Sequence, residues 1–243
     1  MRSIIFLILV LIVPVEIFCQ KIEKRGPYHL KLGIDLPANI IATGTSIYGF
    51  YALVDRSKSD SLTIAQLDFD DVPDFDNWVG PHFSETANKA SDYLFFGSIG
   101  LPAFLLLDRK IRSDALELGI LYWQALGITG VAYTMTAANI TRYRPLAYTN
   151  EAPFKERIRD NAKFSFIAGH PAVVATSTFF MAKVLKDYYP EKKTMHLIAF
   201  SSASALTIAT SYLRHRAGKH FISDMLAGTA VGVLAGILVP QIH

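Results

Sequence analysis

The chain has 243 residues, of which 51% are hydrophobic and 19% are charged. Soluble domains are usually more charged and less apolar, so this composition favours an integral membrane protein over a large soluble helical domain. The formal net charge is only +3 and no run of like charges forms a basic patch, which argues against nucleic acid as a partner. A single cysteine, Cys19, excludes an internal disulfide and a cysteine metal cluster.

Residues 1–20 are predicted to be a signal peptide or an N-terminal anchor. Arg2 gives a small basic start, and Ile4 to Val13 form an apolar core of signal-peptide length. We favour a cleaved signal over an uncleaved anchor. A lipid-anchored Cys19 is a third possibility, but the small residue and the leucine that a lipoprotein signal places before its cysteine are missing.

Residues 21–243 are predicted to form a single membrane phosphatase-like domain, with a core at about 90–240. The expected fold is all-α, a polytopic helical bundle with about six transmembrane helices. The candidate spans are approximately 34–54, 90–107, 114–138, 167–185, 196–213 and 222–240. Several contain Gly, Ala, Ser and Thr, which suit close helix contacts in lipid. The first span is the weakest, because Asp35, Pro37 and Asn39 lie near its start.

Two long polar loops join these spans. Residues 55–89 are rich in aspartate, whereas residues 139–165 carry several arginines and lysines. The remaining links, 108–114 and 186–193, are short and basic. The chain contains no repeat or linker that would divide it into two domains.

Three polar clusters stand at the ends of predicted spans. They are Arg144-Pro145, Gly169-His170, and the group Arg214, His220 and Asp224. Alternation of the spans across the bilayer places all three clusters on one membrane face. Ionisable groups at that depth are costly unless they pair or line a wet cavity, so these residues are candidates for a functional site.

The residue types in these clusters suit phosphoryl transfer. His220 and Asp224 are four residues apart and share one helix face, so we expect the carboxylate to bind one ring nitrogen and leave the other as a nucleophile. Arg144 and Arg214 match phosphate oxygens. Gly169 at a helix start permits close approach of an anion, and His170 could protonate the leaving alcohol. Arg216 and Lys219 are interpreted as ordinary flanking charges.

The spacing of these residues resembles that of the type 2 phosphatidic acid phosphatase family. The run from Arg214 to Asp224 matches the family's third motif, R-x5-H-x3-D. FSFIAGHP, from Phe164 to Pro171, resembles its second motif, PSGH, and Arg144-Pro145 resembles the end of its first motif, K-x6-R-P. The resemblance covers about residues 30–240. Soluble vanadium haloperoxidases share this site, but the apolar composition resembles the membrane branch.

The resemblance implies hydrolysis of a lipid-linked phosphate without a metal or cofactor. His220 would form a phosphohistidine, Asp224 would orient it and His170 would be the general acid. The phosphate would be held by four further residues: Arg144, Arg214, Gly169 and Ala168. The lipid would be phosphatidate, a polyprenyl diphosphate or a phosphorylated glycolipid, its tail remaining in the bilayer.

Two motif positions depart from the family pattern. Ala137 stands where the first motif has lysine, and Ala168 stands where the second has serine. Loss of one preorganised donor can cost about 10²–10³ in rate. The backbone N–H of Ala168 remains, and a cation could come from the basic loop. The loop candidates are Arg142, Lys155, Arg157, Arg159 and Lys163.

These departures keep a second function open, a catalytically impaired relative that binds lipid phosphate or a partner. A transporter is disfavoured, because its charges would lie within the spans. Basic links at 108–114 and 186–193 favour a cytoplasmic position for them, and hence a periplasmic site in a bacterial inner membrane. A cleaved signal followed by six spans would place the site inside instead. The sequence does not indicate an oligomeric state.

Overall fold

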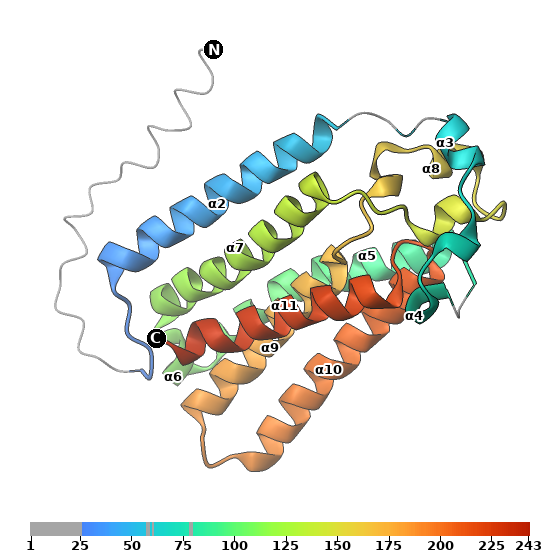
Figure 1. Cartoon of the computed structure of the whole chain (residues 1–243). Helices are drawn as coiled ribbons and strands as arrows, with labels where there is room; N and C mark the ends of the chain where they lie inside the picture. Colours follow the sequence, from blue (N-terminus) through green and yellow to red (C-terminus); the bar gives the residue numbers. More distant parts are fainter. Residues whose placement is uncertain (1–25, 57–58, 60, 78–79) are drawn as a thin grey trace.

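The computed structural model describes residues 26–56, 59, 61–77 and 80–243, and shows a bundle of long helices (Figure 1). The predicted signal peptide or anchor at residues 1–20 lies outside the described residues. The long helices are α2 (Leu32–Val54), α5 (Glu85–Gly100) continued by the 3-10 helix η3 (Leu101–Leu107), α7 (Ala115–Asn139), α9 (Gly169–Tyr188), α10 (Lys193–Arg216) and α11 (Ile222–Gln241). They coincide with the six predicted spans, and the all-α membrane fold is confirmed.

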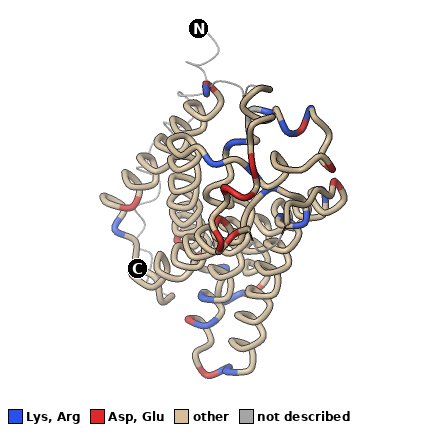
Figure 2. Tube along the Cα trace, turned by 45° about the vertical axis from the view of Figure 1, so that its right-hand side comes forward, with Lys and Arg blue, Asp and Glu red and all other residues tan. Residues whose placement is uncertain are grey.

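Short helices form the connections. They are α3 (Ser61–Ala65), η2 (Phe69–Asp71), α4 (Asp74–Asn77), α6 (Arg109–Arg112), η4 (Pro145–Tyr148), α8 (Phe154–Arg157) and η5 (Asp160–Lys163). Most of them lie in the two long polar loops, which gather at one end of the bundle (Figure 1). Charged residues likewise gather at the helix ends and in the loops (Figure 2).

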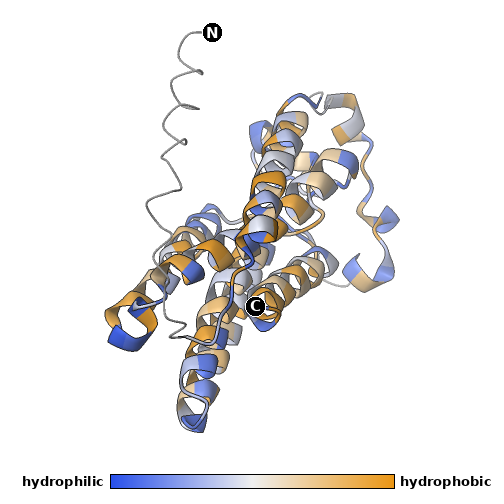
Figure 3. Ribbon diagram, turned by 90° about the vertical axis from the view of Figure 1, so that its left-hand side faces the viewer, coloured by the Kyte–Doolittle hydropathy of each residue, from blue (hydrophilic) through white to orange (hydrophobic). Residues whose placement is uncertain are grey.

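Three helical segments of the described chain are long and apolar enough to cross a membrane: Glu85–Leu107, Ala115–Asn139 and Ile222–Gln241. Helix α9 is less apolar because it is the centre of the bundle, where Thr176, Ser177 and Thr178 are buried against other helices instead of facing lipid. Hydrophobic residues predominate along much of the helices (Figure 3), and many of the large ones are exposed. Ile41 of α2 and Leu226 of α11, for example, are 68% and 67% exposed.

Helix α11 packs closely on α9 through glycines spaced four residues apart. A Cβ at Gly228 would lie 2.3 Å from the carbonyl oxygen of Ala168, and a Cβ at Gly232 would lie 2.1 Å from that of Ala172. These distances are far below van der Waals contact, so only glycine permits this approach. In lipid, where burial of large apolar side chains gains little, such close packing holds helices together.

Polar side chains join the other helices. Thr129 of α7 and Thr176 of α9 share a hydrogen bond of 2.7 Å, and Tyr122 bonds Ser177 at 2.7 Å. The weak start of the first predicted span is explained by Asp35, which is buried and contacts Nε2 of His243 at 3.0 Å. A buried carboxylate is tolerated in an apolar helix when it has such a partner.

Candidate functional site

The three polar clusters meet at one end of the bundle, as the alternation of spans predicts. Arg144 follows α7, Gly169 and His170 begin α9, Arg214 ends α10, and His220 precedes α11. Residues 142–165 fold back on themselves, because Arg142 N donates to Lys163 O at 3.1 Å and Arg144 N donates to Ala162 O at 2.7 Å. This main-chain pairing fixes the loop against the ends of the helices.

His220 is buried, with an exposed fraction of 1%. Its Nδ1 lies 2.6 Å from the carbonyl oxygen of Ser165, an acceptor, so Nδ1 carries the ring proton and Nε2 keeps its lone pair. Burial lowers the pKa of His220 well below its ordinary value, and the positive charges of Arg144 and Arg214 lower it further. The imidazole is therefore neutral at pH 7, the form required of a nucleophile.

The expected hydrogen bond from a ring nitrogen of His220 to the Asp224 carboxylate is replaced by an indirect arrangement. Asp224 accepts from Ser165 Oγ at 2.6 Å and from Phe221 N at 2.9 Å, the latter because a carboxylate at this position of a helix start reaches back to the free N–H. The carbonyl oxygen of Ser165 in turn accepts from Nδ1 of His220. Asp224 thus acts on His220 through Ser165 and through the helix start.

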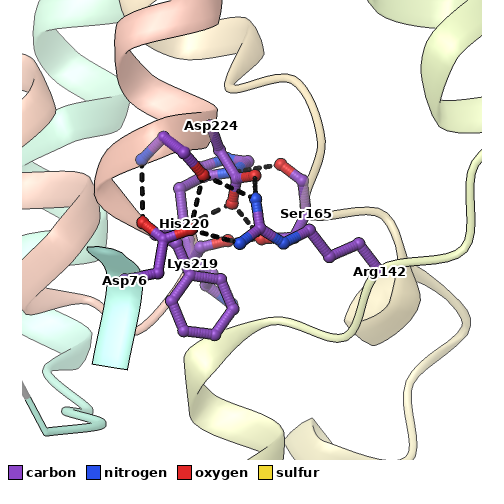
Figure 4. A network of polar contacts seen from close by, with 8 residues as sticks. Asp76, Arg142, Ser165, Lys219, His220 and Asp224 are labelled. Atoms are coloured by element: carbon purple, nitrogen blue, oxygen red, sulfur yellow. Dashed lines mark hydrogen bonds and ion pairs between the residues drawn. The ribbon is translucent and has the colours of Figure 1, made fainter. Parts of the chain in front are cut away.

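A network from the acidic loop supports Asp224 (Figure 4). Arg142 contacts both Asp224 and Asp76 of α4, and Asp76 also accepts from Ser223 N at 2.9 Å. The sequence indicated Arg142 only as a possible replacement cation and gave no role to Asp76. No local pattern marks Asp76 among the aspartates of residues 55–89, so only the tertiary structure identifies it.

Arg144 and Arg214 are buried, with exposed fractions of 5% and 4%. Arg144 donates to Phe164 O at 3.4 Å, a long contact, and Arg214 donates to Asn88 Oδ1 at 2.9 Å. Among the described residues, Nε of each guanidinium has no hydrogen-bond partner. Two desolvated arginines with spare donors are expected where an anion binds.

Helix α5 contributes a group of polar residues to the site that the sequence did not indicate. Asp92 Oδ1 lies 2.8 Å from Nε2 of His170 and 3.7 Å from Nη1 of Arg214, while Ser91 Oγ lies 3.3 Å from the same Nη1. Asn88, Ser91 and Asp92 are spaced three and four residues apart on one helix face. Polar residues at this spacing, running from the end of the predicted loop at 55–89 into the predicted span at 90–107, could have indicated this group from the sequence.

Gly169 and Ala168 have different environments. Gly169 is the first residue of α9, so its N–H has no acceptor within the helix, and a Cβ there would lie 3.0 Å from the ring of Tyr133. The N–H of Ala168 donates to Asp224 O at 3.0 Å. This N–H therefore already has an acceptor, because the close approach of α11 at Gly228 brings Asp224 O to it.

The arginines of the basic loop that were candidates to replace the missing motif lysine have other partners. Arg142 is paired as described above, Arg157 donates to Ala147 O at 3.2 Å and to Asn150 Oδ1 at 2.8 Å, and Arg159 donates to Glu156 at 2.9 Å. Ala137 is fully buried, and its carbonyl oxygen accepts from Arg56 at 2.7 Å. Arg56 also donates to Ile140 O, so it binds two carbonyl groups at the C-terminal end of α7.

Comparisons with known proteins identify the family of the chain. No curated protein matches the chain. One solved structure, the first transmembrane PAP2 type phosphatidylglycerolphosphate phosphatase from Bacillus subtilis, is similar at 17% identity and a TM-score of 0.47, over 87% of this chain and 92% of that chain. The family model of the PAP2 superfamily matches residues 118–243, just over half of the chain, and includes Arg144, His170, Arg214 and His220. The chain therefore belongs to the PAP2 superfamily.

Proposed function

We propose that this protein is a membrane phosphatase that hydrolyses a lipid-linked phosphate through a phosphohistidine intermediate. The observation that carries the proposal is the state of His220, a neutral imidazole whose Nδ1 is held by Ser165 O while Arg144 and Arg214 lie close to the ring. Phosphoryl transfer needs a positioned nucleophile and fixed positive charge around the transferred group.

The proposed reaction has two steps. Nε2 of His220 attacks phosphorus and the bond from phosphorus to the lipid oxygen breaks, while His170 donates a proton to the departing oxygen. Water then attacks phosphorus, the bond from phosphorus to Nε2 of His220 breaks, His170 accepts a proton from that water, and phosphate leaves. Asp92, 2.8 Å from His170, stabilises the protonated imidazole that the first step requires. Asp224 is proposed as a positioning residue that acts through Ser165.

Phosphate release from detergent-purified protein tests this reaction. Phosphatidate, a polyprenyl diphosphate and a phosphorylated glycolipid are offered to the wild type and to His220→Ala. We expect release from at least one lipid by the wild type, and a loss of at least about 10³-fold in the variant. Equal release by both proteins would remove His220 from the mechanism.

A catalytically impaired protein that binds lipid phosphate is the second candidate. Two observations favour it: the N–H of Ala168 is occupied, and Ala137 is buried beneath Arg56. This alternative predicts no release by the wild type and a gain of activity on Ala137→Lys combined with Ala168→Ser.

We further propose that the site faces the periplasm of a bacterial inner membrane. The short basic links lie at the opposite end of the bundle from His220, and such links favour the cytoplasm. A cysteine introduced at Glu151, exposed at the site end, should react with a membrane-impermeant thiol reagent in intact spheroplasts. Reaction only after lysis would reverse the orientation.

A further inference from the structure

In the sequence, Lys219 lies between Arg214, a proposed phosphate-binding residue, and His220, the proposed nucleophile. The sequence suggests an ordinary flanking charge, yet the exposed fraction of Lys219 is only 7%. Flanking lysines normally extend toward water or lipid head groups. A buried ammonium group one residue from the proposed nucleophile therefore requires another explanation.

Local structure forces Lys219 inward. Gly218 has φ of +67°, a conformation that other residues rarely adopt, and a Cβ there would lie 2.0 Å from His82 O. Gly218 O accepts from Leu146 N at 2.9 Å, and Lys219 N donates to Arg214 O at 3.0 Å. The turn after α10 is thus held against residues 144–146, and it presents Lys219 on the same side as Arg144.

Within the described part of the chain, the ammonium group has only a long ion pair, with Glu156. Its Nζ lies 3.7 Å from Oε2 of Glu156, beyond hydrogen-bonding distance, and Glu156 already accepts two bonds from Arg159 at 2.9 and 3.1 Å. Burial and, to a lesser extent, the positive charges of Arg144 and Arg214 lower the pKa of Lys219 to about 8. Three buried cations thus repel one another here, an arrangement that a bound dianion would stabilise.

A cavity of about 320 Å³ opens at this place, large enough for a phosphate group and part of a head group. Its lining includes Lys219, Glu156, Arg159 and Asn88, the last of which accepts from Arg214. Lys89 also lines the cavity, but it is 66% exposed and paired with Glu85 at 2.7 Å. Lys219 is thus the buried lysine of this wall, whereas Lys89 and Lys155 are exposed.

We propose that Lys219 binds the phosphoryl group of the substrate, in place of the lysine that the family pattern has at position 137. The other basic residues near Ala137 have their own partners: Arg56 donates to the carbonyl groups that end α7, and Arg142 contacts Asp76 and Asp224. The identity of the bound group as a substrate phosphate rests on the phosphatase function proposed above.

The experiment compares Lys219→Met and Lys219→Arg with Lys183→Met as the matched control, since Lys183 is a similarly buried lysine toward the other end of the bundle. Removing a charge-assisted hydrogen bond to phosphate should raise KM by about 10- to 100-fold in Lys219→Met, while Lys219→Arg stays within a few-fold of the wild type. Lys183→Met should leave KM unchanged. An unchanged KM and kcat in Lys219→Met would overturn the inference, and His220→Ala separately reports on the proposed function.

Phosphate binding gives a readout that does not need catalysis. Inorganic phosphate is titrated against the melting temperature of each protein, with chloride at equal ionic strength as the control. We expect a stabilising shift in the wild type and His220→Ala, and a midpoint at least about tenfold higher in Lys219→Met.

Each outcome separates the two proposals. A wild type that releases no lipid phosphate but binds inorganic phosphate through Lys219 refutes the phosphatase and keeps the inference. A wild type that shows no phosphate-dependent shift, or a shift that Lys219→Met shares, refutes the inference. If Lys219→Met does not purify as a folded protein, Lys219→Gln keeps a polar side chain and takes its place.

Discussion

The two ends of the helical bundle differ in how completely their buried cations are paired, although both contain ion pairs: at the site end, Arg142 contacts Asp76 and Asp224. At the end away from His220, buried charges have partners: Lys183 contacts Asp187, Tyr28 donates to Asp187 at 2.8 Å, and Tyr188 donates to Asp114. At the site end, Arg144 and Arg214 keep Nε donors without a partner among the described residues, and Lys219 has only a carboxylate at 3.7 Å.

This difference separates structural from functional charge. A buried ion pair with complete hydrogen bonding fixes helices to one another and needs nothing further. Buried cations that lack anions destabilise the ligand-free protein, and they persist where an anion compensates them during function. The contrast therefore provides a physical criterion for the phosphate site that does not depend on motif matching.

The largest difference in kcat/KM is expected between two variants that each remove a buried cation, one from each end of the bundle. Arg214→Ala removes a desolvated cation from the site and should lower kcat/KM by about 10²- to 10³-fold. Lys183→Met removes an equally buried cation from the other end and should leave kcat/KM within about twofold, because Lys183 lies more than three helical turns along α9 from His170. Steady-state kinetics on the best lipid substrate measure both, and comparable losses would refute the contrast.

A smaller effect is expected from pH. The pKa of Lys219 is lowered to about 8 by burial, with Arg144 and Arg214 adding to the shift and Glu156 opposing it. As pH rises through 8 the lysine loses its charge, so kcat/KM should fall by about tenfold over the next unit or two. In Lys219→Arg this alkaline decline should move to higher pH, because arginine stays protonated. A decline unchanged in Lys219→Arg would assign it to another group.

The smallest effect concerns the stability of the ligand-free protein. The lowered pKa of Lys219 corresponds to a cost on the order of 3 kcal/mol for keeping the charge buried. Lys219→Met should therefore raise the melting temperature at pH 7 by a few degrees, whereas Lys183→Met should lower it. The folded-state pKa is depressed, so the cost is full below pH 8 and disappears toward the ordinary value of 10.5. Thermal scans at pH 7 and pH 10 check the sign and the trend.

Much of this fold was predictable from the sequence. The six long helices follow from apolar segments, and the meeting of Arg144, His170, Arg214 and His220 follows from alternation of spans across a bilayer. Asp35, which weakened the first span, lies in α2 because His243, 208 residues away in the chain, binds it. Such a partner cannot be recognised from local composition.

The supporting residues of the site were harder to predict. Asp92 and Asn88 were hidden within an apolar span, and Asp76 was one aspartate among many. Lys219 was misinterpreted because its burial depends on the turn at Gly218 and on the loop at residues 144–146, which meet only in the folded chain. Sequence spacing identified site residues that lie close together in the chain, but not those that a distant segment brings to the site in the folded protein.

The glycines of α11 have a consequence for substrate entry. Gly228 and Gly232 bring α11 against the backbone of α9; His170 lies in the first turn of α9, and His220 lies just before α11. The close helix packing therefore fixes the separation between the proposed nucleophile and the proposed acid. A lipid head group would therefore have to enter between α5 and the loop at residues 142–165, which are not packed in this way. Mutations that change substrate specificity are expected in these two segments.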